Sequence, residues 1–354
     1  MTRWRRSPGA RSAVTALAVL LVICLLVSAR TGAVELSTGQ VLGILAERVG
    51  IRSPWTFDAQ QASLLLGIRA PRLVLGALIG AALATSGAAM QGLFRNPLAD
   101  PALLGVSSGA SLGAVAAIVF GARMLGSFPA ATGLWALSAT AFVAGLAATY
   151  ISAGVARVAG RTRTALMLLA GVAVNALGWA GIGLAMHVAT DAQLRNITFW
   201  TLGSVGGATW HAVMVTGPLL LATVLILPRF ARGLNALLLG EAEAMHLGVR
   251  VERVKRAVVV LTALGVGASV SVAGAVGFVG LVVPHVVRLM VGPDHRRLLP
   301  GAALLGASLL TLADVGARTA AAPAELPLGV VTAAIGAPFF LWQLTRDRAS
   351  AVLQ

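Results

Sequence analysis

One serine in the sequence stands in a pattern that could support nucleophilic catalysis. Gly105, Ser107 and Gly109 form the motif G-x-S-x-G, which places a nucleophilic serine on a sharp strand-to-helix turn in hydrolases. Here the motif opens an apolar run and no strand pattern precedes it. Close packing of small residues between helices is therefore the favoured interpretation, and an intramembrane hydrolase is the less favoured one.

The histidines and the single lysine argue against two further kinds of chemistry. The five histidines are dispersed, form no H-E-x-x-H motif and have no nearby cysteine, so we expect no metal site. The only lysine, Lys255, follows Val254 and not glycine, so the chain lacks the P-loop motif G-x-x-x-x-G-K-[ST]. We therefore predict a protein that is not an enzyme and needs no cofactor. Any ATP that drives it must be hydrolysed on another subunit.

The composition describes a membrane protein. Of the 354 residues, 58% are hydrophobic and 11% are charged, whereas soluble proteins carry roughly 25% charged residues. The basic residues lie between apolar runs, so we expect membrane lipid as their surroundings and no nucleic acid. Cys24 is the only cysteine, so no intramolecular disulfide can form.

Ten apolar segments have lengths suited to crossing a bilayer. They are 13–29, 73–92, 103–121, 134–156, 165–187, 211–228, 257–276, 277–291, 299–313 and 326–344. The expected fold class is all-α, a polytopic membrane protein with about ten transmembrane helices in one domain over residues 1–354. An even number of spans puts both termini on one side, and the loops of that side hold most of the arginines. The positive-inside rule then places both termini, including the short tail 1–12, in the cytoplasm. A cleaved signal peptide is the alternative for segment 13–29.

A short repeat suggests that the two halves of the chain are related. Gly87 stands ten residues before Pro97, and Gly274 stands ten residues before Pro284. The copies lie five spans apart, so they run in opposite directions, as in the inverted repeats of transporters. Pro97 disfavours helical geometry at Asn96, and we expect a helix break there and a counterpart at Pro284. These breaks either lie near the translocation path or the ATPase-facing end and move during transport, or they are static kinks.

Few polar residues interrupt the apolar segments. Acidic residues are nearly absent from them, whereas ion-coupled carriers usually keep ionisable groups at mid-membrane. Gln91, Asn175 and His285 are the predicted buried exceptions. They could line a path, or they could form hydrogen bonds between helices.

The largest loop on the terminal side, residues 229–256, predicts a short helix outside the lipid. Leu237, Glu241, Ala244 and Gly248 recur at helical spacing before a glycine stop. The segment is acidic and rich in small residues, unlike a basic helix on a membrane surface, so docking to a cytoplasmic protein is favoured.

Three arginines lie on the opposite side, against the charge rule: Arg69, Arg72 and Arg318. Their side chains either snorkel to lipid headgroups or meet an acidic partner at the outer face.

The chain resembles the FecCD-type permeases of ATP-driven (ABC) importers for iron-siderophores, haem and vitamin B12. The matching segments follow the family order over nearly the whole chain: 68–72, 91–101, 104–110, the loop around Glu241, 277–288, 292–296, 325–329 and 336–338. The one noted departure is Arg-Ala-Pro-Arg at 69–72, where the family usually has Arg-Leu-Pro-Arg.

The resemblance implies an assembly of two permease copies, two cytoplasmic ATP-binding subunits and an extracytoplasmic substrate-binding protein. It assigns ATPase coupling to Gly240, Glu241, Ala244, Leu247 and Gly248, binding-protein docking to Arg69, Arg72 and Arg318, and an inner gate to Thr164 and Ala165. The function expected is that of a non-catalytic permease working by alternating access. An ion-coupled secondary transporter acting alone is the alternative. Segments 199–210 and 322–327 look most like haem permeases, with siderophore or cobalamin left open.

Overall fold

The computed structural model describes residues 9–125 and 130–352. Within this part the regular structure is helical apart from one hairpin, β1 (Arg157–Val158) and β2 (Arg161–Thr162). Seven of its helical stretches are long and apolar enough to cross a membrane, and three shorter apolar helices complete the ten predicted segments. The ten correspond to α1 (Gly9–Arg30), α4 (Ala70–Phe94), α5 (Val106–Leu125), α6 (Ala130–Val155), α7 (Thr164–His187), α9 (Trp210–Ile226), α12 (Val251–Ala273), α13 (Val279–Val291), α14 (His295–Thr319) and α15 (Leu328–Val352). Residues 1–8 of the predicted tail lie outside the described residues.

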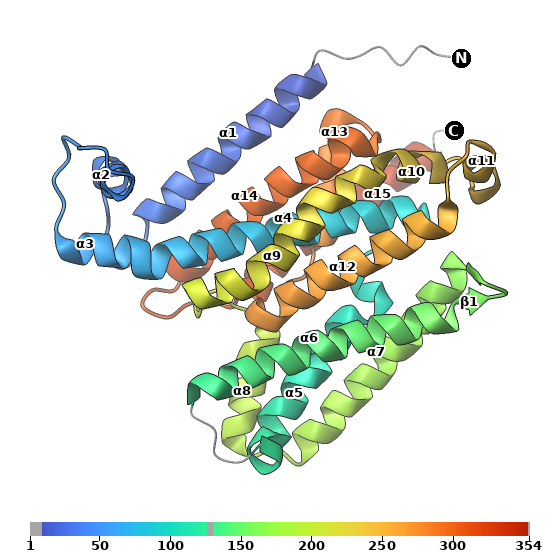
Figure 1. Ribbon diagram of the computed structural model, residues 1–354, viewed down its shortest axis with the longest axis horizontal. Helices are drawn as coiled ribbons and strands as arrows, with labels where there is room; N and C mark the ends of the chain where they lie inside the picture. The colour runs from blue at the N-terminus through green and yellow to red at the C-terminus, as the bar shows by residue number, and fades with distance from the viewer. Residues whose placement is uncertain (1–8, 126–129, 353–354) are drawn as a thin grey trace.

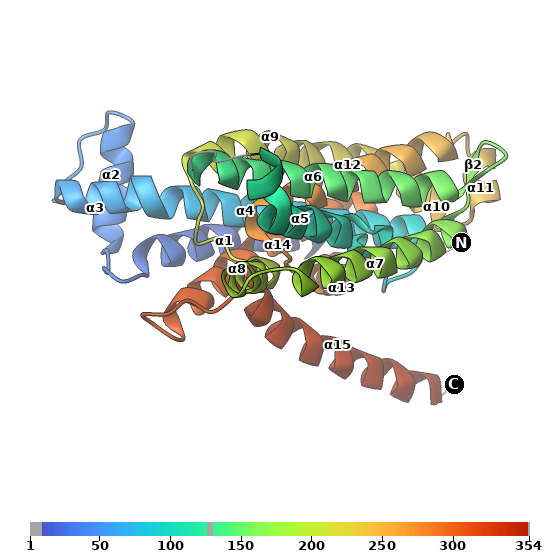
Figure 2. The ribbon, with the colours of Figure 1, turned by 90° about the horizontal axis from the view of Figure 1, so that it is seen from below.

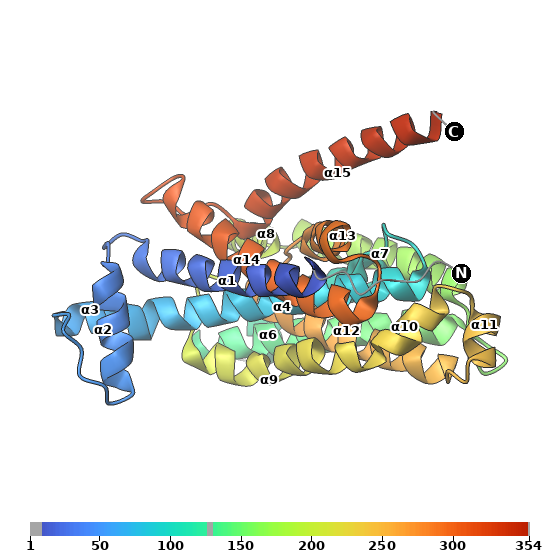
Figure 3. The ribbon, with the colours of Figure 1, turned by 90° about the horizontal axis from the view of Figure 1, so that it is seen from above.

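The axes of the long helices lie roughly along one line, with neighbouring helices running up or down it, and α4 is in the middle (Figure 1). α4 contacts α9 and α12 on one side and α14 on the other, while α5, α6 and α7 form a neighbouring group. One end carries α2 (Thr38–Arg48) and α3 (Ala59–Ser63), and the opposite end carries α10 (Ala231–Leu237), α11 (Glu241–His246) and the hairpin. α15 projects obliquely from this body (Figures 2 and 3).

Small residues allow α4 to occupy the centre. Every residue from 79 to 93 is buried. Gly80 of α4 faces Gly306 of α14, and a β-carbon on either glycine would collide with the backbone carbonyl of the other. Helix association in lipid depends on such close backbone approach, so this pair sets the distance between the two helices.

The predicted helix break at Pro97 is confirmed, but the one at Pro284 is wrong. α4 ends at Phe94, and Arg95 follows in the left-handed region with φ 52°. α13 instead continues through Pro284, and the irregular stretch comes earlier, from Gly274 to Phe278. α4 and α12 run in opposite directions (Figure 1). The second copy lies after α12, however, and its part in α13 runs along α4 in the same direction, since Gly280 packs on Gly87 and Arg288 donates to Gln91. The opposite orientation expected for the two copies is therefore not found. Their local structures differ, because Gly87 lies inside α4 whereas Gly274 ends α12.

Pro284 still has a structural effect, which is seen in the packing of α13 against α4. Proline has no N–H to donate to the carbonyl four residues earlier, and that carbonyl belongs to Gly280. It points at Gly87, where a β-carbon would collide with it. The glycine of the first copy therefore makes room for a carbonyl released by the proline of the second.

A π-helical turn, η1 (Leu64–Arg69), joins α3 to α4. In a π-turn the carbonyl of Leu66 would accept from the N–H of residue 71, but that residue is Pro71. The indole Nε1 of Trp210 donates to the Leu66 carbonyl at 2.8 Å. The connection from α3 to α4 can thus enter the bundle without leaving this polar atom unsatisfied.

Three helices were not predicted from the sequence: α2, α3 and α8 (Asp191–Leu202). Each begins with a capping box, formed by Ser37 with Gln40, by Asp58 with Gln61 and by Thr190 with Gln193. A search for long apolar runs does not detect short helices, although the capping-box pattern was readable.

We predict that Gly80→Ala destabilises the protein by about 1–3 kcal/mol, the usual cost of forcing extra volume into a packed core. The colliding atom is a backbone carbonyl, which cannot rotate away. Gly76→Ala, one turn earlier on α4, is the matched control, because no atom lies within 4 Å of a β-carbon there. Thermal unfolding in detergent micelles measures both, and equal midpoints for the two variants would contradict the packing argument.

Candidate functional site

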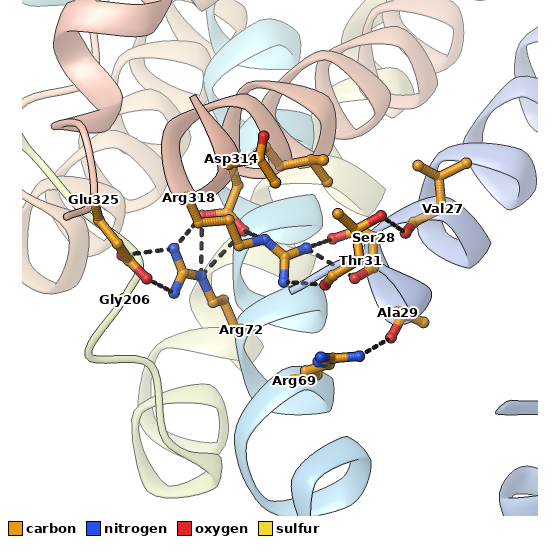
Figure 4. A network of polar contacts seen from close by, with 12 residues as sticks. Val27, Ser28, Ala29, Thr31, Arg69, Arg72, Gly206, Asp314, Arg318 and Glu325 are labelled. Atoms are coloured by element: carbon orange, nitrogen blue, oxygen red, sulfur yellow. Dashed lines mark hydrogen bonds and ion pairs between the residues drawn. The ribbon is translucent and has the colours of Figure 1, made fainter. Parts of the chain in front are cut away.

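A cluster of buried charges closes the end of the bundle near α2 and α3 (Figure 4). Arg72 of α4 lies between two carboxylates: its Nη2 donates to Asp314 of α14 at 2.8 Å, and its Nη1 donates to Glu325 at 2.8 Å. The side chains of Arg72 and Asp314 are 11% and 7% exposed, whereas that of Glu325 is 44% exposed. The guanidinium therefore joins α4, α14 and the connection from α14 to α15.

The two other arginines of this group bind backbone carbonyls at the end of α1. Arg69 donates to the carbonyls of Ala29 and Arg30 at 2.8 and 3.1 Å and also to that of Val34. Arg318 donates to the carbonyl of Ser28 at 2.8 Å and to that of Thr31 at 2.9 Å. Both arginines thus supply donors to carbonyls that the end of a helix leaves without partners.

These contacts change the interpretation of Arg69, Arg72 and Arg318. Neither headgroups nor an external acid is needed to explain their position, because partners within the chain occupy all three guanidinium groups. Their docking role stays a prediction. Asp314 and Glu325 were not predicted as their partners, because both lie far from Arg72 in the sequence.

The segment predicted to couple to an ATPase forms two short helices and not one. Gly240, with φ 133°, separates α10 from α11, and Gly248, with φ 77°, ends α11. Ala244 is fully buried within its own chain, and the coupling role of the predicted set stays a prediction. The exposed large apolar residues of the segment are Leu238, Leu239, Met245 and Leu247, at 41%, 66%, 48% and 64% exposure. Leu239 and Met245 were missed by the sequence analysis.

Lys255 connects this segment to the hairpin. Its side chain is 1% exposed, and its ammonium lies 2.7 Å from Oε1 of Glu241 in α11. The same nitrogen donates to the carbonyl of Thr162 in β2 at 2.6 Å. Thr162 in turn donates to Glu252 through its hydroxyl at 2.9 Å and its amide at 3.1 Å. Thr164, the first residue of α7 and a predicted gate residue, is two residues further along the chain.

A second set of polar contacts joins the same segment to α14. Asn235 of α10 donates to Asp294 at 2.6 Å, and its Oδ1 accepts from the amide of His295 at 2.9 Å. The ring Nδ1 of His295 lies 2.8 Å from the same oxygen. Burial raises the pKa of the Asp294 carboxyl, but hydrogen bonds from the Arg296 amide and Asn235, together with the charges of Arg296 and Arg297, lower this pKa overall. Asn235 was not predicted, since a lone asparagine in a loop gives no specific signal.

The predicted path residues form contacts between helices. Gln91 of α4 accepts from Arg288 of α13 at 2.7 Å, Asn175 of α7 donates to the carbonyl of Ala102 at 3.1 Å, and His285 of α13 lies 3.0 Å from Gln343 of α15. Asn96 is exposed and accepts from the amide of Leu98 at 2.9 Å, while Ala165 is exposed beside Thr164 at the start of α7. The structure does not bring these residues together in one place.

No group of three metal-binding side chains occurs among the described residues. The two clusters of charged side chains lie at opposite ends of a bundle whose apolar helices are long enough to cross a membrane. These features are those of a polytopic helical membrane protein.

The comparisons with known proteins identify the family. The model of the FecCD transport family matches residues 20–346, and the chain belongs to this family. It is 45% identical over 334 residues to the hemin transport system permease protein HmuU of Yersinia pestis, covering 94% of this chain and 95% of that protein. It is 41% identical over 332 residues to the vitamin B12 import system permease protein BtuC of Escherichia coli O9:H4, covering 94% of each.

A further relative and a solved structure agree with this assignment. The cobalamin import system permease protein BtuC of Halobacterium salinarum is 45% identical over 303 residues, which is 85% of this chain and 78% of that protein. A structure described as an inward-facing conformation of a metal-chelate type ABC transporter superposes with a TM-score of 0.81 at 30% identity, covering 95% of this chain and 99% of that one. The chain is accordingly a permease of the ABC importer class, and the secondary transporter is not favoured.

We predict that the link between Arg72 and Glu325 weakens in acid. The hydrogen bond from Arg72 lowers the pKa of Glu325 below its ordinary 4.5. Stability from a depressed carboxyl pKa is present above the unfolded-state pKa and is lost as the pH falls through the folded-state pKa. Wild-type protein should thus lose more thermal stability than Glu325→Gln between about pH 5 and 3, by less than about 1 kcal/mol because Glu325 is well exposed.

Glu35→Gln is the control for this titration, because Glu35 is exposed at the same end and forms no ion pair with a described residue. Its acid dependence should equal that of the wild type. If Glu325→Gln showed the same acid dependence as well, the proposed link would carry no measurable stability.

Proposed function

We propose that this permease is driven by two cytoplasmic ATP-binding subunits that dock on the α10–α11 segment. The observation that carries the proposal is the contact of Lys255 with both Glu241 in α11 and Thr162 in the hairpin. A displacement of α11 by a bound ATPase would act on the hairpin and so on Thr164 and Ala165 at the start of α7. Leu239, Met245 and Leu247, exposed around Gly240 and Gly248, offer the apolar contact surface.

The same proposal implies which end of the permease faces the cytoplasm and where the substrate-binding protein docks. The α10–α11 end faces the cytoplasm together with both termini, in line with the arginine-rich loops on that side. The α2–α3 end then faces outward, where a substrate-binding protein would dock. Arg48 and Arg52 are exposed at this end and could contact the binding protein. Arg69, Arg72 and Arg318 instead hold α1, α4 and α14 together.

A second copy of this chain is the third proposed partner, and the substrate path would lie between the two copies. α15 stands away from the body and presents Ile335, Leu341 and Trp342 at 48%, 63% and 53% exposure. In a membrane these side chains meet either lipid or another permease. We propose a homodimer, which the mass of the purified complex in lipid nanodiscs would test.

We propose haem as the cargo. The support is the 45% identity to the hemin permease of Yersinia pestis over nearly the full length of both chains, together with the likeness of segments 199–210 and 322–327 to haem permeases. Cobalamin and ferric siderophores are the competing cargoes of the same family.

We predict that Lys255→Met uncouples transport from ATP hydrolysis while the protein still folds. Methionine fills a similar apolar volume, and the abandoned carboxylates of Glu241 and Glu252 are 41% and 36% exposed, so water can solvate them. Substrate moved per ATP should fall about fivefold or more, the size of an ordinary coupling free energy of about 1 kcal/mol or above. Proteoliposomes holding the permease with its ATPase provide the measurement.

Arg253→Met is the matched control. It removes one positive charge from the same turn of α12, but Arg253 is exposed and forms no ion pair with a described residue. Unchanged transport per ATP in Lys255→Met would exclude the link as the coupling route. Failure of the wild-type chain to assemble with any ATP-binding subunit would instead reject the proposed driver.

The cargo is tested with the binding protein loaded in turn with haem, cyanocobalamin or a ferric siderophore. Only the haem-loaded protein should raise ATP hydrolysis by the reconstituted complex severalfold. Stimulation by cyanocobalamin alone would assign the chain to cobalamin import.

A further inference from the structure

An apolar groove lies between α6 and α12, near the end that carries α11 and the hairpin. It encloses about 370 Å³, within the roughly 300–1,000 Å³ of typical ligand sites. Leu146 and Ala153 of α6 line it together with Val259 and Ala263 of α12. The groove opens outward, because Tyr150 on its rim is 80% exposed and Val260 is 50% exposed.

Two arginines stand where the groove meets the end of the bundle. Arg157 follows α6 and Arg256 lies in the second turn of α12, and both line the groove. Both are exposed, and neither makes an ion pair or side-chain hydrogen bond with a described residue. Their positive charge is therefore available to a ligand.

Besides the exposed hydroxyl of Tyr150, the other polar side chains near the groove have partners within the chain. The ammonium of Lys255 is directed to Glu241 and Thr162, and the hydroxyl of Thr149 donates to the carbonyl of Gly145 at 3.0 Å. None of the described residues lining the groove is acidic, and the nearby Glu252 is bound by Thr162. The site thus combines an apolar groove with two arginines at one end, Arg157 and Arg256, that form no ion pair with a described residue.

We propose that this groove binds an acidic phospholipid. Its acyl chain would lie between α6 and α12, and its phosphate would accept hydrogen bonds from Arg157 and Arg256, since guanidinium groups bind phosphate in a bidentate manner. Basic pockets between transmembrane helices are suited to anionic headgroups. The inference depends on the membrane-spanning fold and not on the cargo or the ATPase, so it can fail while the proposed function stands.

Native mass spectrometry of the purified permease titrated with phosphatidylglycerol or phosphatidylcholine tests the proposal. Wild-type protein should bind phosphatidylglycerol at least about fivefold more tightly than phosphatidylcholine. The double variant Arg157→Gln/Arg256→Gln should lose this preference. The control, Arg232→Gln/Arg250→Gln, removes the same charge from exposed positions at the same end and should keep it.

Ala153→Phe provides a second test that leaves the charge unchanged. Its ring would occupy the apolar groove and should weaken binding of phosphatidylglycerol, even if the arginine variant fails to fold. Retained preference for phosphatidylglycerol in the folded arginine variant, or unchanged affinity for phosphatidylglycerol in folded Ala153→Phe, would overturn the proposal.

A second copy of the chain is the other possible occupant of this face. Oxidation of a Tyr150→Cys variant in a Cys24→Ser background should yield no disulfide-linked dimer if lipid covers the groove. Efficient cross-linking would show that another permease covers it and would also overturn the proposal.

Discussion

Backbone carbonyls that have no partner within their own helix impose the main constraint on this fold. At membrane depth each such carbonyl needs a hydrogen-bond donor from the protein, or it must be buried within the protein away from lipid. Trp210 donates to the Leu66 carbonyl ahead of Pro71, and Arg69 and Arg318 donate to carbonyls at the end of α1. The Gly280 carbonyl, freed by Pro284, instead packs on Gly87. Tryptophan and arginine thus supply donors to such carbonyls, whereas Gly87 only leaves room for one.

The same constraint explains why the buried arginines are costly to change. Asp314 is 7% exposed and depends on Arg72 for its strongest contacts. Loss of one partner from a buried pair generally costs about 3–5 kcal/mol, because the other charge is left without water or a counterion. Arg72 can therefore be essential for folding whether or not a partner protein ever touches it, and an activity measurement on its variants needs a folding control.

Hydropathy predicted the ten apolar segments, because a long run of nonpolar residues can satisfy its backbone hydrogen bonds in a bilayer only as a helix. It could not predict α2, α3 or α8, whose helices depend on local caps, nor the continuation of α13 through Pro284, which depends on Gly87 across the interface. Helical spacing predicted a short helix around Glu241, which the structure contains, yet the burial of Ala244 and the contacts of Lys255 were not foreseen. Both follow from packing between segments that lie far apart in sequence.

The buried Lys255 is the only lysine in the chain, and this gives the protein a single internal amine for chemical modification. Acylating reagents attack the uncharged, accessible form of an amine, and the Lys255 nitrogen is enclosed and held by Glu241 and Thr162. Its rate of acylation would consequently report how often α11 and the hairpin separate. The unaltered chain thus contains a chemical reporter of that opening, at a side chain that contacts both segments.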